Sequence, residues 1–207
     1  MPRVSATRVL AAILTLYGIL FAAGGLLSGQ ETAPKPKISN MPLAADQLAV
    51  YRAVLVSWFQ GEKFSVNLSE LTSTSTSPDG SETECGRGLQ LEPGSSEVHR
   101  FQERDLLQLG LGAHIHLVDP EGQAGQVRAH DPGDAIRNGK TVDDAVTEGF
   151  AHGLFTLGEI RFNHDHTRAV VAFSFWCGSL CGHGGTVLVE KKNGAWKQKK
   201  RCGGWVS

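Results

Sequence analysis

The chain begins with a long apolar run and continues with shorter, periodic patterns. Residues 9–27 contain no charged side chain, and Arg3 and Arg8 precede them. A basic amino terminus followed by an apolar run is typical of an export signal. The run is also long enough to cross a bilayer, which takes roughly 17–25 residues. We therefore expect residues 1–29 to be either a cleaved signal peptide or a retained membrane anchor, with the rest of the chain outside the cytoplasm.

Two main helices are expected in the exported part. After Pro42, which suits the first turn of a helix, apolar residues recur at intervals of three and four as far as Gly61. Thr141 is placed to cap a second helix that ends near Gly153. The apolar stripes are Leu48, Tyr51, Leu55 and Trp58 in the first helix and Val142, Val146, Phe150 and Leu154 in the second. The first stripe is expected to pack in the core.

The last fifty residues alternate between apolar runs and turn residues, which predicts an antiparallel β-meander. Its expected strands are 157–162, 168–176, 186–191 and 195–202. The strand over 168–176 is nearly all apolar and is expected at the centre of the sheet, and Asn193-Gly194 is typical of a tight hairpin. Two further short strands are expected at 88–92 and 113–118.

These elements predict an α+β fold class. The expected organisation is a signal peptide or anchor over 1–29, a Pro- and Lys-containing linker over 30–41, and a single α+β domain over 42–207. That domain would combine two main helices with a C-terminal antiparallel β-meander.

Charge adds one local feature. The formal net charge of the 207 residues is −1 and no basic block is present, which argues against nucleic acid as a partner. Six cations gather near the end of the chain: Lys191, Lys192, Lys197, Lys199, Lys200 and Arg201. On an edge strand such charges discourage pairing with another sheet, and we expect that role here.

The chain has four cysteines, Cys85, Cys177, Cys181 and Cys202. An even number in an exported chain favours disulfides. The pairing that we favour joins Cys177 to Cys181 across a small loop and Cys85 to Cys202 across a long one. Two other pairings remain open.

Cys177, Cys181 and His183 also suit other chemistry. Thiolate and imidazole groups bind zinc or copper, so a metal site is one alternative. A thiol activated by His183, or a redox pair, is another. However, Cys-x3-Cys-x-His is not a strong zinc signature, and thioredoxin-like pairs are Cys-x2-Cys at a helix start. We therefore expect no metal and no cofactor, and the role of His183 stays open.

No catalytic constellation is recognisable elsewhere. The chain has no Gly-x-Ser-x-Gly elbow and no glycine pattern for binding phosphates or dinucleotides. His114 and His116 are expected as exposed polar residues on an edge strand, and His164 and His166 as exposed residues in a turn.

Several segments carry a family resemblance: Glu159-Ile160-Arg161-Phe162, Ala169-Val170-Val171, the cysteine turn over 177–184, the segment 190–197 and Trp205-Val206-Ser207. In these the chain resembles a family of uncharacterised exported bacterial proteins, of the kind found in acidobacteria. The resemblance implies export and one α+β domain. It implies no known activity, so it assigns no catalytic residue.

The sequence thus predicts a cell-envelope protein, periplasmic or secreted, or held in the inner membrane through residues 9–27 if they are not cleaved. We expect a non-enzymatic binding or scaffolding domain whose partner is a protein or a small molecule. One alternative is a thiol-redox or metal-binding protein that uses Cys177, Cys181 and His183. A second alternative is a hydrolase with an unrecognised site.

Overall fold

The computed structural model describes residues 35–59, 65–74, 81–112 and 114–207. The segment expected as a signal peptide or anchor lies outside these ranges. Within them, no helix is both long and apolar enough to cross a membrane. The chain divides into two units, and the unit Pro36–Ser207 contains all the elements considered below.

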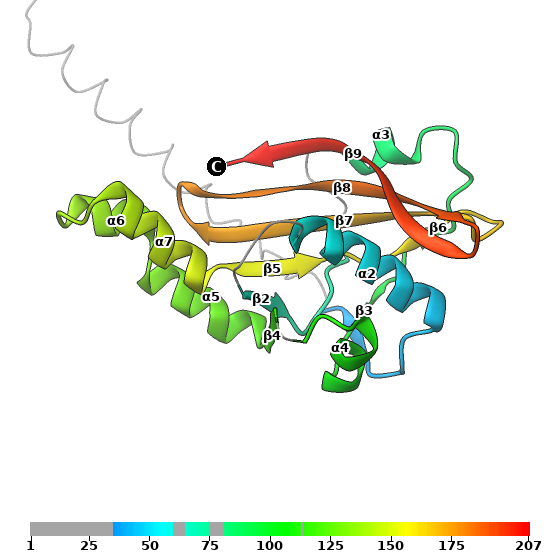
Figure 1. Ribbon diagram of the computed structural model, residues 1–207, viewed down its shortest axis with the longest axis horizontal. Helices are drawn as coiled ribbons and strands as arrows, with labels where there is room; N and C mark the ends of the chain where they lie inside the picture. Colours follow the sequence, from blue (N-terminus) through cyan, green and yellow to red (C-terminus); the bar gives the residue numbers. More distant parts are fainter. Residues whose placement is uncertain (1–34, 60–64, 75–80, 113) are drawn as a thin grey trace, which may run out of the picture. The chain divides into compact units, whose positions relative to one another are not determined.

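A mixed sheet of seven strands organises this unit (Figure 1). The strands are β2 (Val66–Ser69), β4 (Ile115–Val118), β5 (Leu154–Leu157), β6 (Arg161–Phe162), β7 (Arg168–Gly178), β8 (Cys181–Lys192) and β9 (Ala195–Val206). Their order is β4-β2-β5-β7-β8-β9, and β6 pairs with β7. β4, β2 and β5 run parallel, whereas β5, β7, β8 and β9 are antiparallel neighbours. The antiparallel part is the predicted C-terminal meander, and β9 forms one edge of the sheet.

The described residues form six helices: α2 (Ala45–Phe59), α3 (Ser81–Gly86), α4 (Glu103–Leu109), α5 (Pro120–Ala129), α6 (Pro132–Arg137) and α7 (Val142–His152). A separate pair of short parallel strands is formed by β1 (Lys37–Ser39) and β3 (Glu97–His99). The predicted α+β class is confirmed. The helices are more numerous than the two main ones expected, and β1 lies inside the segment expected as a linker.

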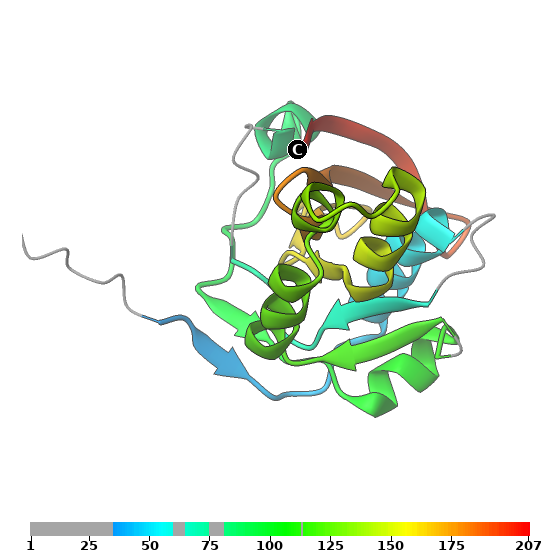
Figure 2. The same cartoon turned by 90° about the vertical axis from the view of Figure 1, so that its left-hand side faces the viewer.

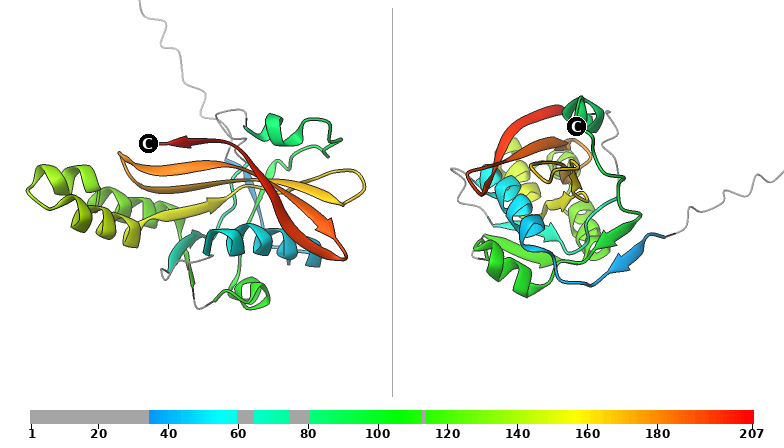
Figure 3. Two further views of the ribbon diagram at one scale, coloured as in Figure 1. Left: turned by 45° about the horizontal axis from the view of Figure 1, so that its top comes forward. Right: turned by 90° about the vertical axis from the view of Figure 1, so that its right-hand side faces the viewer.

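α2 covers one face of the sheet and α3 the other (Figure 3). Leu48, Tyr51 and Leu55 of α2 are buried in the main core, as their spacing predicts, and Trp58 is half-buried beside them. On the opposite face, Cys85 of α3 joins Val170, Leu188 and Cys202 in a second, smaller apolar cluster. The alternation of Val170 and Val171 between the two clusters shows that β7 is buried on both faces.

Two predicted strands are wrong. The segment 88–92 contains only an isolated bridge between Leu91 and Asn163. The expected strand over 157–162 is divided into β5 and β6. The division occurs at Gly158, whose N–H donates to the carbonyl of Ala172 and where an added Cβ would lie 3.1 Å from the Ala172 Cβ. A close approach of two backbones interrupts the regular side-chain alternation there.

α7 begins as predicted, because Thr141 Oγ1 accepts a hydrogen bond from the N–H of Asp144. Its apolar stripe, however, faces outward: the exposed fractions are 59% for Val142, 37% for Val146 and 47% for Phe150. Leu154 is buried, but as the first residue of β5. α7 packs beside α5 and α6 at one end of the sheet (Figure 2).

The reason for this orientation is a face of small residues. Ala145 and Gly149 are the buried residues of α7. An added Cβ on Gly149 would lie 2.5 Å from Pro132 Cγ, and one on Gly153 would lie 2.3 Å from Phe175 Cζ. The glycines allow the helix to approach closely, and this contact determines which face is buried.

Candidate functional site

The cysteine turn connects β7 to β8 and is closed by a disulfide between Cys177 and Cys181, whose Cα atoms are 5.0 Å apart. Asp131, the N-cap of α6, holds the turn from outside. Its carboxylate accepts hydrogen bonds from the Ser179 N–H at 2.6 Å and the Ser179 hydroxyl at 3.2 Å. Although burial acts to raise the pKa of Asp131, hydrogen bonds from Ser179, Gly133 and Asp134 lower it overall.

A second disulfide joins Cys85 to Cys202, with Cα atoms 5.4 Å apart. The two bonds are the pairs that the sequence favoured, and they engage all four cysteines. Bonded sulfurs are not available as thiolate ligands or nucleophiles. Within the ranges that the structure describes, no group of three or more His, Cys, Asp or Glu side chains is arranged to hold a metal ion.

His183 packs in an aromatic cluster. Its ring centroid is 4.7 Å from that of Trp58 and 5.8 Å from that of Phe175. The Arg201 guanidinium lies 5.8 Å from the Trp58 ring centroid. Burial, and secondly the positive charge of Arg201, lower the pKa of His183. The structure therefore holds this imidazole as a neutral ring against apolar neighbours.

The other histidines lie apart from His183. His116 is exposed on β4, the opposite edge strand of the sheet from β9, and His114 precedes that strand. His164 and His166 lie in the turn before β7, where the His166 ring stacks on Phe162 at 4.7 Å and contacts Glu92 at 3.1 Å. His116 therefore lies on the expected edge strand and His114 just before it, whereas His164 and His166 lie in the expected turn.

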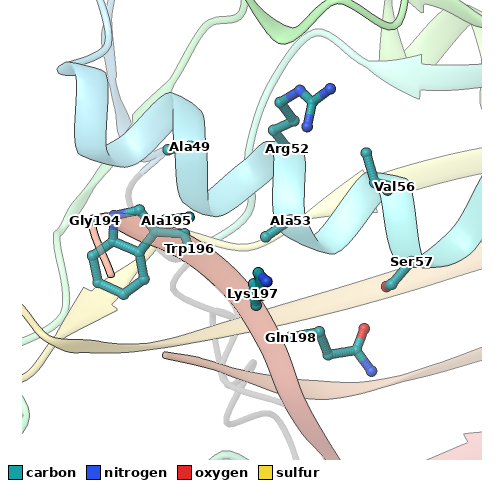
Figure 4. Close-up of a pocket in the computed structure, with 10 residues that line it drawn as sticks. All are labelled: Ala49, Arg52, Ala53, Val56, Ser57, Gly194, Ala195, Trp196, Lys197 and Gln198. Atoms are coloured by element: carbon teal, nitrogen blue, oxygen red, sulfur yellow. The ribbon is translucent and has the colours of Figure 1, made fainter. Parts of the chain in front are cut away.

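A groove of about 770 Å³ lies between α2 and β9 (Figure 4). The α2 side is formed by one helix face, and the β9 side by the start of the strand and the hairpin before it. The lining residues are Ala49, Arg52, Ala53, Val56 and Ser57 on one side and Gly194, Ala195, Trp196, Lys197 and Gln198 on the other. The small side chains of Ala49 and Ala53 leave space on the helix side of the groove.

The β9 lining residues are consecutive, which shows what part of the strand meets the groove. Side chains of neighbouring strand residues point to opposite faces, so a face would contribute every second residue. Four consecutive residues of β9, Ala195–Gln198, together with Gly194 of the turn, are instead what the edge of the strand would contribute. The order of the sheet agrees, because β9 has β8 on one side and no strand of the described chain on the other.

The hairpin register indicates which backbone groups point into the groove. Asn193 and Gly194 have φ of 52° and 79°, as a two-residue type I′ turn requires. The N–H of Lys191 donates to the carbonyl of Thr167, away from β9, so Lys191 and its partner Trp196 form a non-hydrogen-bonded pair. The N–H and C=O of Trp196 consequently point away from β8. By the alternation of the ladder, those of Gln198 do the same.

The Trp196 side chain beside this edge is held in place by hydrogen bonding. Its indole Nε1 donates to Asp46 at 3.1 Å, and Lys191 Nζ donates to both oxygens of Asp46 at 2.9 Å. The hydrogen bond from Lys191, followed by that from Trp196, lowers the pKa of Asp46. The carboxylate of Asp46 is thus already paired.

The lining itself carries positive charge. Arg52 and Lys197 are the cations among the described lining residues, which include no Asp or Glu, and the Arg52 Nε donates to the carbonyl of Leu109 at 2.9 Å. Glu190 of β8, which pairs with Lys197 of β9 in the sheet register, forms ion pairs with Lys199, Lys192 and Arg168 at 3.0–3.3 Å. Hydrogen bonds from Lys199 and then Lys192 lower the pKa of Glu190 to about 2. In the part of the chain that the structure describes, no carboxylate is paired with Arg52 or Lys197, and no strand pairs with this edge of β9, so positive charge lies next to the edge.

Sequence reasoning identified the cations of β9 but not the groove. The sequence feature that could have indicated the groove is the repeat of small residues Ala49, Ala53 and Ser57, which lies on the side of α2 away from the buried stripe. Comparison with known proteins found no matching family model, no matching curated protein and no matching solved structure.

Proposed function

We propose that this protein is a non-enzymatic binding domain of the cell envelope, and that the groove between α2 and β9 binds an extended, acidic segment of a partner protein. Its place in the envelope rests on the export signal predicted for residues 1–29. The observation that carries the binding proposal is the edge of β9 that pairs with no described strand and lies beside a groove whose described lining includes cations but no Asp or Glu.

The backbone supplies the affinity in this proposal. A peptide added beside residues 195–198 would extend the sheet for about 13 Å, at about 3.3 Å per residue. The outward N–H and C=O groups of Trp196 and Gln198 would exchange hydrogen bonds with it, as in other cases of strand addition. Ala49 and Ala53 leave room on the helix side for the side chains of the added strand.

The charges select the partner. Arg52 and Lys197 attract carboxylates, and the exposed pairs would be screened by salt. The same cations oppose pairing of β9 with a second β9, because like charges would then face each other across the new ladder. Protection of the edge and recognition of an acidic strand are therefore two consequences of one arrangement.

Peptide binding to the full-length protein tests the proposal. Fluorescent peptides of about eight residues, alternating Val with Glu or Val with Lys, are compared by anisotropy at low salt and at about 0.5 M salt. The Glu peptide is expected to bind saturably, with an affinity that falls as salt rises, and the Lys peptide is expected not to bind.

A matched pair of variants locates the site. Lys197→Glu should weaken binding of the Glu peptide by about tenfold or more, because it replaces attraction with repulsion in the groove. Lys200→Glu makes the same change of charge on the same strand but outside the lining, and should have a much smaller effect. Equal effects of the two variants, or equal binding of both peptides, would refute the proposal.

A further inference from the structure

A second cavity has a volume of about 570 Å³. It lies beside α7 and shares no described lining residue with the groove between α2 and β9. Its walls come from four elements: β2, β4, α7 and β7. The apolar lining residues are Val66, Val146, Phe150, Ala151 and Phe175, and the polar ones are Ser65, Asn67, His116 and Thr147. A mostly apolar concavity of this size with a few polar groups is typical of a small-molecule site.

The outward orientation of α7 creates this cavity. Phe150 is 47% exposed, although its ring centroid is only 5.2 Å from that of the buried Phe175. The helix cannot rotate to bury Phe150 further, because Gly149 and Gly153 leave no space even for a Cβ against Pro132 and Phe175. Asn67 fixes the end of α7 as well, since its side-chain N–H groups donate to the carbonyls of Ala151 and Gly153.

The lining defines what can bind. Among the described residues that line the cavity there is no Lys, Arg, Asp or Glu, and His116 is the one whose side chain can carry a positive charge. A ligand with several charges would lack partners there, and burying an unpaired charge is costly. An aliphatic chain fits the Val and Phe surfaces, and one small anionic head group fits His116.

We propose that this cavity binds the chain of a medium-length aliphatic monocarboxylate, with its carboxylate beside His116. This site is separate from the β9 groove and does not depend on the function proposed for that groove.

Photolabelling of the full-length protein tests this site. The probe is dodecanoate with a diazirine near the end of the chain, and unlabelled dodecanoate serves as competitor. The expected result is saturable labelling that maps to residues 146–151 or to the segment around Val66 and is removed by the competitor. Labelling confined to residues 1–29, or labelling that the competitor leaves unchanged, would overturn the proposal.

Variants of α7 separate the cavity from general adhesion. Phe150→Ser removes an apolar wall and is expected to reduce labelling by about tenfold. Val142→Ser changes another exposed apolar residue of the same helix that does not line the cavity, and should label like the wild type. Similar losses in both variants would show non-specific contact with an apolar surface and would contradict the proposal.

The head group has its own test. Dodecanol should compete about tenfold less well than dodecanoate, and His116→Gln should reduce that difference. If the alcohol competes equally in the wild type, the assignment of a carboxylate beside His116 is wrong.

Discussion

Removal of the Cys85–Cys202 disulfide should have a much larger effect on stability than removal of the Cys177–Cys181 disulfide. The first bond joins residues 117 apart and the second joins residues 4 apart. The chain-entropy relation for the unfolded state gives roughly 5 kcal/mol for the long loop and roughly 2 kcal/mol for the short one. Replacing each pair by two alanines should therefore produce losses that differ by about 3 kcal/mol.

The folded state adds to the effect of the long disulfide. Cys85 and Cys202 are both almost fully buried and form a small cluster with Val170 and Leu188. α3, which contributes Cys85, has six residues and is too short to be stable as an isolated helix. Without the bond, α3 loses its covalent link to β9 and part of this buried cluster.

Urea unfolding followed by circular dichroism measures both losses. A decrease of about 5 kcal/mol corresponds to a melting temperature lower by roughly 10–20 °C in a domain of this size. Wild-type protein treated with a reductant should be about as stable as the variant lacking all four cysteines, which is the control. Equal losses for the two pairs, or a loss below about 1 kcal/mol for the Cys85–Cys202 pair, would refute the loop-entropy reasoning.

Three further predictions concern single residues. Gly149→Ala should destabilise the protein by about 1–3 kcal/mol, because the added Cβ would overlap Pro132. Gly125→Ala in α5 should stabilise it by up to about 1 kcal/mol, because no atom lies within 4 Å of the added Cβ. The midpoints of urea unfolding measure both effects. Asp131→Ala should lower the free energy of unfolding by about 1–2 kcal/mol, through the lost helix cap and the lost hydrogen bonds to the cysteine turn, as thermal unfolding at neutral pH would show. The pKa of His183 is lowered from 6.5 in the folded state, so the unfolded state binds a proton first as the pH falls. The free energy of unfolding should therefore decrease as the pH drops below about 6.5. In urea titrations between about pH 7 and pH 5, His183→Phe should show a smaller decrease than the wild type.

The parts of the fold that could be predicted are those with local signals. The spacing of Leu48, Tyr51 and Leu55 predicts the buried face of α2, and all three side chains are buried. Asn193-Gly194 determines the β8–β9 hairpin through its positive φ angles. Thr141 determines the start of α7 through its side-chain cap.

The parts that were missed depend on contacts between distant segments. The apolar stripe of α7 is outward because Gly149 meets Pro132 and Gly153 meets Phe175, and hydrophobic periodicity does not detect such close packing. The parallel pairing of β2 with β4 and β5 joins segments separated by several helices. Both cavities are formed between such segments, so the sequence indicated the cations of β9 without the groove beside them.

The central claim is that β9 receives an added strand, and hydrogen exchange of individual β9 amides tests it most directly. Full-length protein is compared with and without a saturating concentration of the Val-Glu peptide, and exchange is followed by NMR. We predict that the outward amides of Trp196 and Gln198 exchange at least about tenfold more slowly with the peptide bound, because they then donate to its carbonyls. Lys197, whose amide faces β8, should change little. Unchanged exchange at Trp196 and Gln198 in the peptide-saturated protein would contradict strand addition.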